Sequence, residues 1–146
     1  MRARRNRPGP GGRRTGAPGR TGGDGGPRRN SALRADPLDA IEAFETLDVR
    51  VGRVIRAELN AQARKPSYKL WIDFGPLGEK TSSAQLTAHY RPEQLVDRLV
   101  VAVVNLGVRN VAGFTSEVLV LGVPDVSGAT VLLAVERDVP LGGRVY

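Results

Sequence analysis

The chain has 146 residues, of which 22 are basic and 15 acidic, so its formal net charge is +7. It has no cysteine and one histidine, which excludes disulfides and thiol catalysis and argues against a zinc site. No apolar stretch is long enough to span a bilayer or to serve as a signal sequence, so we expect a cytoplasmic protein without a membrane segment, cofactor or metal.

The charge is concentrated in the first part of the chain. Residues 1–36 carry ten arginines against Asp24 and Asp36, a net charge of +8, whereas residues 37–146 hold 12 basic and 13 acidic groups. Rich in glycine and proline, residues 1–36 cannot offset their ordering entropy by burial, and we predict that they are disordered. Three interpretations stay open: an Arg/Gly arm that binds phosphates, a solvated tail without a role, or a stretch upstream of the true start.

Residues 37–47 are predicted to form a short helix. Asp36 is placed to act as the N-cap, with Pro37 at the first helical position. One apolar face repeats at helical spacing and consists of Leu38, Ile41, Phe44 and Leu47. We expect this face to pack in the core or to form a dimer contact.

From residue 47 onward the apolar period changes to two, which is typical of strands. Gly52 interrupts the first strand at a point where a bulge or sharp coil would sit. Further strands are predicted at residues 70–74, 82–87, 99–106, 118–121 and 130–135, with a single helical turn at 92–96. This order predicts a mainly β fold: a five-stranded Greek-key barrel of the OB-fold type, with short flanking helices and a disordered N-terminal tail.

Four motifs in a fixed order carry a family resemblance. They are Asp48-Val49-Arg50-Val51-Gly52, Ser82-Ser83-Ala84-Gln85, Asn105 with Arg109, and Gly113 followed by Ser116-Glu117. Together they resemble the tRNA-binding OB-fold module, in particular its small CsaA-like version, over roughly residues 41–146. The resemblance implies two segments: the tail at 1–36 and a tRNA-binding domain at 37–146. It also implies a homodimer that binds tRNA by shape, without catalysis, and a link to the chaperoning of unfolded or exported polypeptides.

The resemblance and the residue types together predict a tRNA contact set. Its members offer cations, amides and hydroxyls suited to phosphates, base edges and 2′-hydroxyls: Arg50, Lys69, Ser82, Ser83, Gln85, Asn105, Arg109, Ser116 and Glu117. Scaffold roles stay open for several of them. Asn105 could bond only a turn, Ser116 and Glu117 could bridge two loops or orient Arg109, and Arg50 could pair with Asp48.

Other residues are compatible with more than one role. Trp71 is placed either to stack a base or to lie in a subunit interface, for which the helix at 38–44 and residues 139–146 are further candidates. Basic loop residues such as Arg64 and Lys65 could contact phosphates. Residues 105–111 contain one arginine and no proline, which predicts a thinner basic patch than CsaA-like loops usually carry.

Two other functions remain in view. No nucleophile elbow, phosphate-binding loop or dinucleotide fingerprint is present, and His89 near Ser82 is weak support for catalysis. A polypeptide-binding chaperone, with a groove lined by Trp71, Val108 and Phe114, is the main alternative to tRNA binding. A third possibility is a module that docks on a synthetase in trans.

Overall fold

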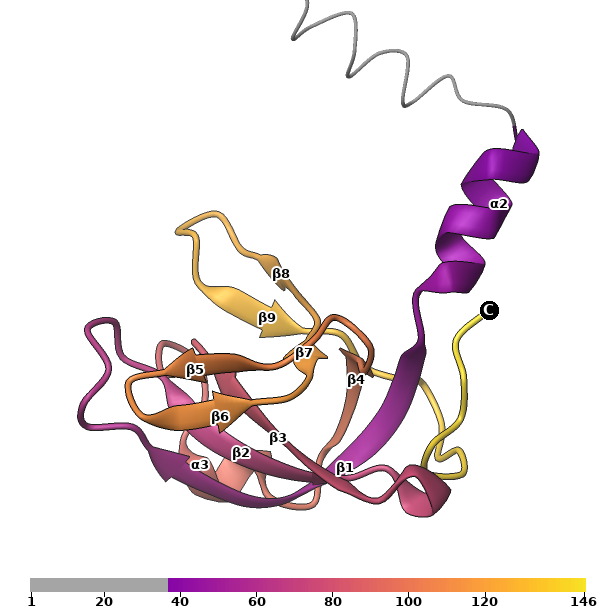
Figure 1. Cartoon of the computed structure of the whole chain (residues 1–146). Helices are drawn as coiled ribbons and strands as arrows, with labels where there is room; N and C mark the ends of the chain where they lie inside the picture. Colours follow the sequence, from indigo (N-terminus) through magenta and orange to yellow (C-terminus); the bar gives the residue numbers. More distant parts are fainter. Residues whose placement is uncertain (1–36) are drawn as a thin grey trace, which may run out of the picture. The chain divides into compact units, whose positions relative to one another are not determined.

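The computed structural model describes residues 37–146 (Figure 1). The predicted tail at 1–36 and the predicted cap Asp36 lie outside the described residues. The elements in chain order are α2 (Pro37–Thr46), β1 (Val49–Leu59), β2 (Tyr68–Asp73), the 3₁₀ turn η1 (Gly75–Leu77), β3 (Glu79–Ala84), α3 (Pro92–Leu95), β4 (Leu99–Val103), β5 (Arg109–Val111), β6 (Phe114–Ser116), β7 (Leu119–Val120), β8 (Gly122–Pro124) and β9 (Thr130–Leu132).

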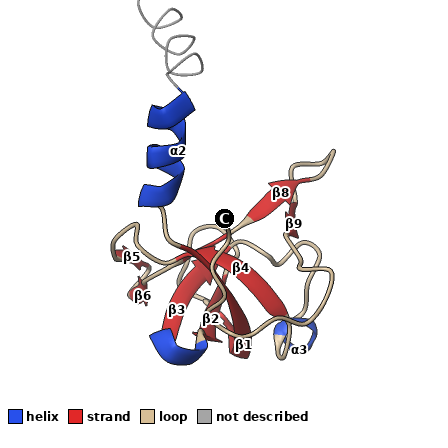
Figure 2. Cartoon of the chain, turned by 90° about the vertical axis from the view of Figure 1, so that its right-hand side faces the viewer, coloured by secondary structure: helices blue, strands red, loops and turns tan. Residues whose placement is uncertain are grey.

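The main sheet is a nearly closed five-stranded antiparallel barrel. Its strand order is β3-β2-β1-β4-β7, and α3 lies between β3 and β4 in the chain, as the OB-fold prediction requires. The gap between the last strand and β3 is bridged by Thr81, whose carbonyl accepts the N–H groups of Glu117 and Val118 at 2.8 and 3.1 Å. Figure 2 shows β1 to β4 as neighbouring curved strands, with α3 beside them. The predicted fold class is confirmed.

The core lies inside this barrel. Its fully buried side chains are large and apolar: Val54, Leu70, Ile72, Phe74, Leu86, Leu95 and Val100. Alternate residues of β2 are buried, which is the period-two pattern expected of a strand with one solvent side. A smaller apolar cluster, formed by Val49, Val51, Val101 and Val103, occupies the other face of β1 and β4.

Several predicted boundaries were displaced. The predicted third strand, at 82–87, is β3 at Glu79–Ala84, because its pairing with β2 begins at Glu79 opposite Asp73. The fourth ends at Val103 rather than residue 106. The helix is found where predicted, but its apolar face is not core: Ile41 and Phe44 are 52% and 45% exposed.

Two small hairpins stand beside the barrel, and most of their strands were not predicted. β5 pairs with β6 through a tight turn in which Ala112 and Gly113 both have positive φ, at 49° and 82°. A two-residue hairpin turn of this kind matches the twist of its strands. β8 pairs with β9, and the two hairpins are visible above and in front of the barrel strands in Figure 1.

The core packs closely against β1 at Gly52, where a side chain has no room. The register shift lies between Val54 and Arg56, where β1 pairs with β2, so the bulge predicted at Gly52 occurs a few residues later. Gly52 itself continues the ladder opposite Val100. A Cβ at this position would lie 2.6 Å from Ile72 Cγ2 and 2.8 Å from the Phe74 ring. Both neighbours are fully buried, so they have little room to yield.

We therefore expect Gly52→Ala to lower the free energy of unfolding by about 2 kcal/mol, through overpacking of the core. Thermal or urea unfolding of both proteins measures the difference. The Phe74→Leu background is the control, since it removes the ring that the new methyl would meet, and the cost of Gly52→Ala should shrink there. An equal cost in both backgrounds would contradict this explanation.

Candidate nucleic-acid interface

A groove of about 920 Å³ runs along one side of the barrel. Its walls come from segments far apart in the sequence: the β1–β2 loop at residues 62–67, the end of β3 with the turn after it, residues 106–112 including β5, and the β7 strand. Buried Leu86 and Val118 form part of its lining. The β1–β2 loop and the β5–β6 turn lie on the same side of the domain in Figure 1.

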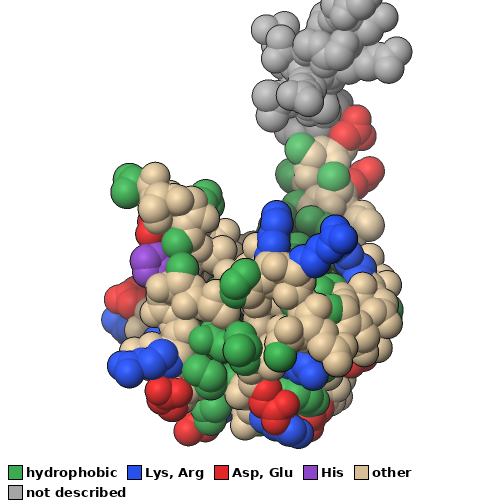
Figure 3. Space-filling view, turned by 90° about the vertical axis from the view of Figure 1, so that its left-hand side faces the viewer, with side chains coloured by type: hydrophobic (Ala, Val, Ile, Leu, Met, Phe, Trp, Pro, Cys, Tyr) green, Lys and Arg blue, Asp and Glu red, His purple; other side chains and the backbone are tan. Residues whose placement is uncertain are grey.

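The groove is basic although the domain is not. Arg64 and Lys65 reach it from the β1–β2 loop and Arg109 from the start of β5, and all three are exposed. Among the described residues that line it there is no aspartate or glutamate. Figure 3 looks at this side and shows basic side chains close to an apolar area. Because residues 37–146 carry a net charge near zero, the groove is a local positive patch.

One buried side chain ties the two banks of the groove together. Asn60 follows β1 and is 3% exposed. Its Nδ2 donates to the Val111 carbonyl at 3.3 Å, across to β5, and its Oδ1 accepts the Gln62 N–H at 3.2 Å. Its own N–H donates to the Ser67 carbonyl at 2.9 Å. Asn60 thereby fixes the basic loop and the Arg109 strand relative to each other.

Four of the nine predicted contact residues line the groove: Ser83, Gln85, Arg109 and Ser116. The Ser116 hydroxyl accepts the Ser83 N–H at 2.9 Å, so it also helps to attach β6 to β3. Gln85 and Arg109 are exposed, and the fold leaves their polar groups accessible to a ligand.

The side chains of Ser82 and Glu117 make hydrogen bonds within the protein. Ser82 is fully buried and its hydroxyl donates to the Val118 carbonyl at 2.8 Å, because it faces inward opposite Leu70. The Glu117 carboxylate accepts the Thr81 N–H at 3.2 Å and lies 2.9 Å from the Thr81 hydroxyl. Glu117 therefore connects β3 to the segment between β6 and β7, which is a scaffold role, and it bonds Thr81 rather than Arg109.

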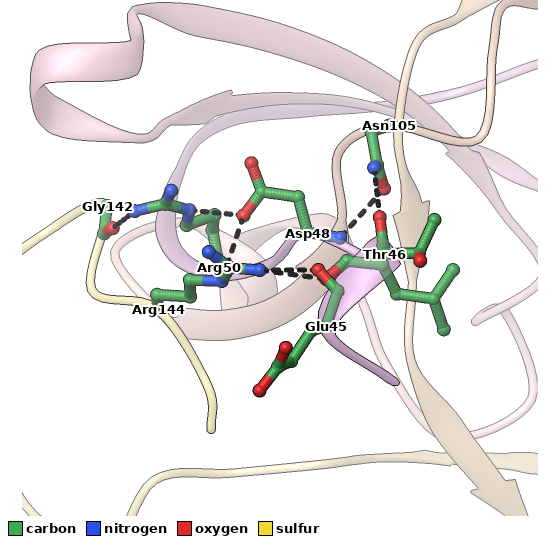
Figure 4. Close-up of polar contacts among 8 residues, drawn as sticks. Glu45, Thr46, Asp48, Arg50, Asn105, Gly142 and Arg144 are labelled. Atoms are coloured by element: carbon green, nitrogen blue, oxygen red, sulfur yellow. Dashed lines mark hydrogen bonds and ion pairs between the residues drawn. The ribbon is translucent and has the colours of Figure 1, made fainter. Parts of the chain in front are cut away.

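Asn105 and Arg50 belong to the junction between α2 and β1 (Figure 4). The Asn105 amide accepts the Asp48 N–H and donates to the Thr46 carbonyl, both at 2.8 Å. The Arg50 guanidinium donates to Asp48 at 2.6 Å and to the Gly142 carbonyl at 3.0 Å. Neither residue lines the groove. Their polar groups hold the helix end and the C-terminal segment on the barrel.

Lys69 lies on the outer face of β2, beside the groove rather than in it. It is paired with Ser83, which does line the groove, and its Nζ is 5.7 Å from the ring centroid of Phe114. The Trp71 ring meets Phe114 edge-on, with centroids 5.4 Å apart. The apolar lining proposed for a peptide groove differs from the structure, which places Leu106 and Leu119 there instead of Trp71, Val108 and Phe114.

The single histidine is part of a hairpin contact. His89 Nε2 lies 2.6 Å from an Asp125 carboxylate oxygen. Hydrogen bonding by the Ser127 hydroxyl, together with His89, holds the pKa of Asp125 well below its usual range. Both side chains therefore serve the turn between β8 and β9. The described residues contain no group of three or more His, Cys, Asp or Glu side chains placed to hold a metal.

Two parts of the candidate site are not in the predicted contact set. Arg64 and Lys65 are basic loop residues of a kind found in any solvated loop, and only the folded structure shows that their loop lines the groove. Asn60 gave no signal, because a polar residue after a strand is ordinary.

None of the described helices is long and apolar enough to cross a membrane.

Known proteins share the sequence pattern and the fold of this chain. The family model described as "Putative tRNA binding domain" matches residues 49–144. The crystal structure of the chaperone CsaA from Bacillus anthracis is 49% identical, with a TM-score of 0.69, covering 73% of this chain and 96% of that one. The MetRS-related protein from Pyrococcus horikoshii is 29% identical, with a TM-score of 0.66 and coverage of 73% and 95%.

Larger proteins contain a similar segment. The methionine–tRNA ligase of Archaeoglobus fulgidus is 37% identical over 106 residues, which cover 73% of this chain and 16% of the ligase. The chain thus spans about a sixth of the length of the ligases that it matches. On the family match and the two full-length structural matches, this chain belongs to the tRNA-binding domain family.

Proposed function

We propose that the chain binds tRNA without catalysis, through the groove between the β1–β2 loop and β5. The observation that carries this proposal is the local concentration of Arg64, Lys65 and Arg109 around a groove whose described lining has no carboxylate. Phosphates supply most of the affinity in nucleic-acid binding. In a domain of near-zero net charge, that attraction has to come from such a patch. A tRNA partner would place the protein in the cytoplasm.

The other lining groups suit RNA. Gln62, Gln85 and Asn110 offer amides that can both donate to and accept from base edges, and the Ser83 hydroxyl can meet a 2′-hydroxyl. Arg109 supplies a planar fork for a phosphate or a guanine edge. From the predicted contact set we therefore retain four residues as proposed contacts: Ser83, Gln85, Arg109 and Ser116. We add Arg64 and Lys65 to them. Lys69, which lies beside the groove, is proposed as a contact at its edge.

The remaining predicted residues enter the proposal as supports. Asn105, Arg50 and Glu117 hold the helix junction and the β3–β6 contact, and buried Ser82 helps to close the barrel. Replacing one of them would change tRNA binding through the fold rather than through a lost contact.

The alternative function is binding of extended, unfolded polypeptides. It is favoured by Leu106 and Leu119, which line the groove and are 52% and 48% exposed, and by the similarity to proteins named chaperone CsaA from Bacillus anthracis and Picrophilus torridus. Apolar side chains in a groove also suit unpaired bases, so this observation does not displace the tRNA proposal. The polar and basic lining favours RNA.

We also propose that two copies of the chain associate through α2 and the C-terminal segment. Ile41, Phe44 and Val145 are between a third and just over a half exposed, and Tyr146 is fully exposed. Phe44, Val145 and Tyr146 line one shallow hollow of about 420 Å³. A two-fold dimer would cover these apolar surfaces and present two grooves to one RNA.

The first prediction concerns Arg109. Replacing it with alanine in the full chain should weaken binding of bulk tRNA about tenfold, since a charge-assisted contact to phosphate is lost. The slope of log affinity against log salt should fall by about 0.7–0.9. Fluorescence anisotropy of labelled tRNA at several salt concentrations measures both quantities.

Arg137→Ala is the matched control, because it removes the same charge from an exposed position outside the groove. It should leave the affinity within about twofold. If the Arg109 variant and the Arg64/Lys65 double alanine variant both bind tRNA as tightly as the wild-type chain, the groove is not the site. Binding would then be sought on residues 1–36 or on another face.

The second prediction concerns the dimer. The full chain should have a solution mass near twice 15.7 kDa by light scattering, and Phe44→Glu should halve it by placing a charge in the apolar contact. Val126→Glu, at a fully exposed position on the β8–β9 turn, should leave the mass unchanged. A monomeric wild-type chain at micromolar concentration would refute the association.

A further inference from the structure

Two cations and two aromatic rings meet over the outer face of β2, two of them from β2 itself and one each from β1 and β6. We call them the aromatic–cation cluster: Arg56, Lys69, Trp71 and Phe114. The Arg56 guanidinium carbon lies 4.3 Å from the Trp71 ring centroid, and Phe114 meets the same ring edge-on. Lys69 Nζ lies 5.7 Å from the Phe114 centroid. Each aromatic ring therefore has a cation beside it.

Trp71 is not needed to fill the core. Its neighbours along β2, Leu70 and Ile72, are fully buried, whereas Trp71 is only half-buried on the opposite face. In the sheet register it is paired with Arg56 of β1 and Thr81 of β3. The only tryptophan of the chain is thus placed on the solvent side of the sheet.

The cluster is continuous with the proposed RNA groove. Lys69 is opposite Ser83, a groove residue, on the same face of the sheet. Phe114 begins β6, whose partner strand β5 carries Arg109 into the groove. A polynucleotide whose phosphates lie along the groove would therefore have its next unpaired base within reach of these rings.

The Arg56 side chain, which covers the Trp71 ring, is held weakly. The Arg56 side chain is 60% exposed and is paired with Glu58, itself 44% exposed. Exposed ion pairs of this kind contribute little to stability, so the guanidinium can leave the ring at small cost. A base on the indole would replace one flat π-contact with another, as happens on the stacking platforms of single-strand-binding proteins.

Charge also limits how the strand can approach. Glu58 lies opposite Lys69 on β1, and Asp73 follows Trp71 on the same face of β2. Glu58 repels phosphates on the β1 side of Lys69, and Asp73 repels them beyond Trp71, whereas the β3 side of Lys69, at Ser83, leads to the groove. The RNA backbone is therefore favoured on the β3 side of Lys69, with the base directed onto Trp71.

From this arrangement we propose that Trp71 is the stacking subsite for an unpaired base of the RNA bound in the groove, with Phe114 supporting its edge and Arg56 serving as a displaceable cover. This inference rests on the proposed function. It adds that the ligand has a single-stranded nucleotide next to its groove-bound phosphates.

The single tryptophan allows a direct test on the unaltered full chain. Intrinsic fluorescence is followed during titration with bulk tRNA, with an unstructured oligoadenylate, and with inorganic polyphosphate as a polyanion that has no bases. We expect both RNAs to quench Trp71 emission, with a midpoint equal to that from anisotropy. Polyphosphate should leave the emission unchanged. In Arg109→Ala, quenching and anisotropy midpoints should move together.

Variants give a second readout. Trp71→Leu should weaken oligoadenylate binding about 5–20-fold, the loss expected for one stacked base, and Trp71→Phe should restore most of it because an aromatic face remains. Ile55→Leu, at an exposed position on β1, is the control and should bind like the wild type. Equal affinity in all three variants would overturn the proposal.

The fluorescence outcomes separate the two proposals. If tRNA anisotropy rises and Arg109 matters but Trp71 emission stays constant, the stacking subsite is refuted while tRNA binding by the groove stands. If no RNA binds, the proposed function fails and this inference fails with it. Equal quenching by polyphosphate, or emission that depends on protein concentration without RNA, would also refute stacking; the second result would place the ring in a subunit interface.

Discussion

The fold depends on the close packing of the core against the backbone of β1 at Gly52. One strand serves two partners, β4 along its first half and β2 along its second, and the C-terminal segment joins its edge at Val51 through two backbone hydrogen bonds with Gly142 and Gly143. With the Ile72 and Phe74 side chains pressed against the backbone at Gly52, the strand has no room for a side chain there. Because β1 pairs with both β4 and β2, it joins the two halves of the barrel sheet, and the loop that follows β1 becomes one bank of the groove.

Three polar residues of the motifs singled out in the sequence form a structural junction. Asp48, Arg50 and Asn105 meet at the point where α2, β1 and the C-terminal segment come together, and their polar groups are nearly all directed at one another or at backbone (Figure 4). An amide and an arginine are as well suited to such a junction as to RNA, because both satisfy several backbone groups at once. Residue type in a motif therefore does not by itself separate support from contact.

The sequence predicted the fold well and the candidate site in part. Strands with buried alternating residues, such as β2, were predictable because their period is set by the core. The short strands β5, β6 and β8 were not, since they bury little and are defined by pairing alone. At the candidate site, Gln85 and Arg109 line the groove, whereas Ser82 is paired opposite Leu70 and faces the core. The strand register turns the Ser82 side chain toward the core, and residue type alone does not reveal that register.

The groove shows how a domain without excess positive charge can present a basic site. Its cations come from two loops that are separated by more than forty residues, and attraction to phosphates adds only when these loops keep a fixed spacing. Buried Asn60 maintains this spacing by bonding the β1–β2 loop and the Val111 carbonyl together. An arginine-rich segment without fixed structure gains affinity for a polyanion from each added arginine, whereas a site of this kind gains affinity from the fixed positions of its cations. Shape-dependent recognition of a folded RNA requires that property, since the same number of unplaced charges would bind any polyanion equally well.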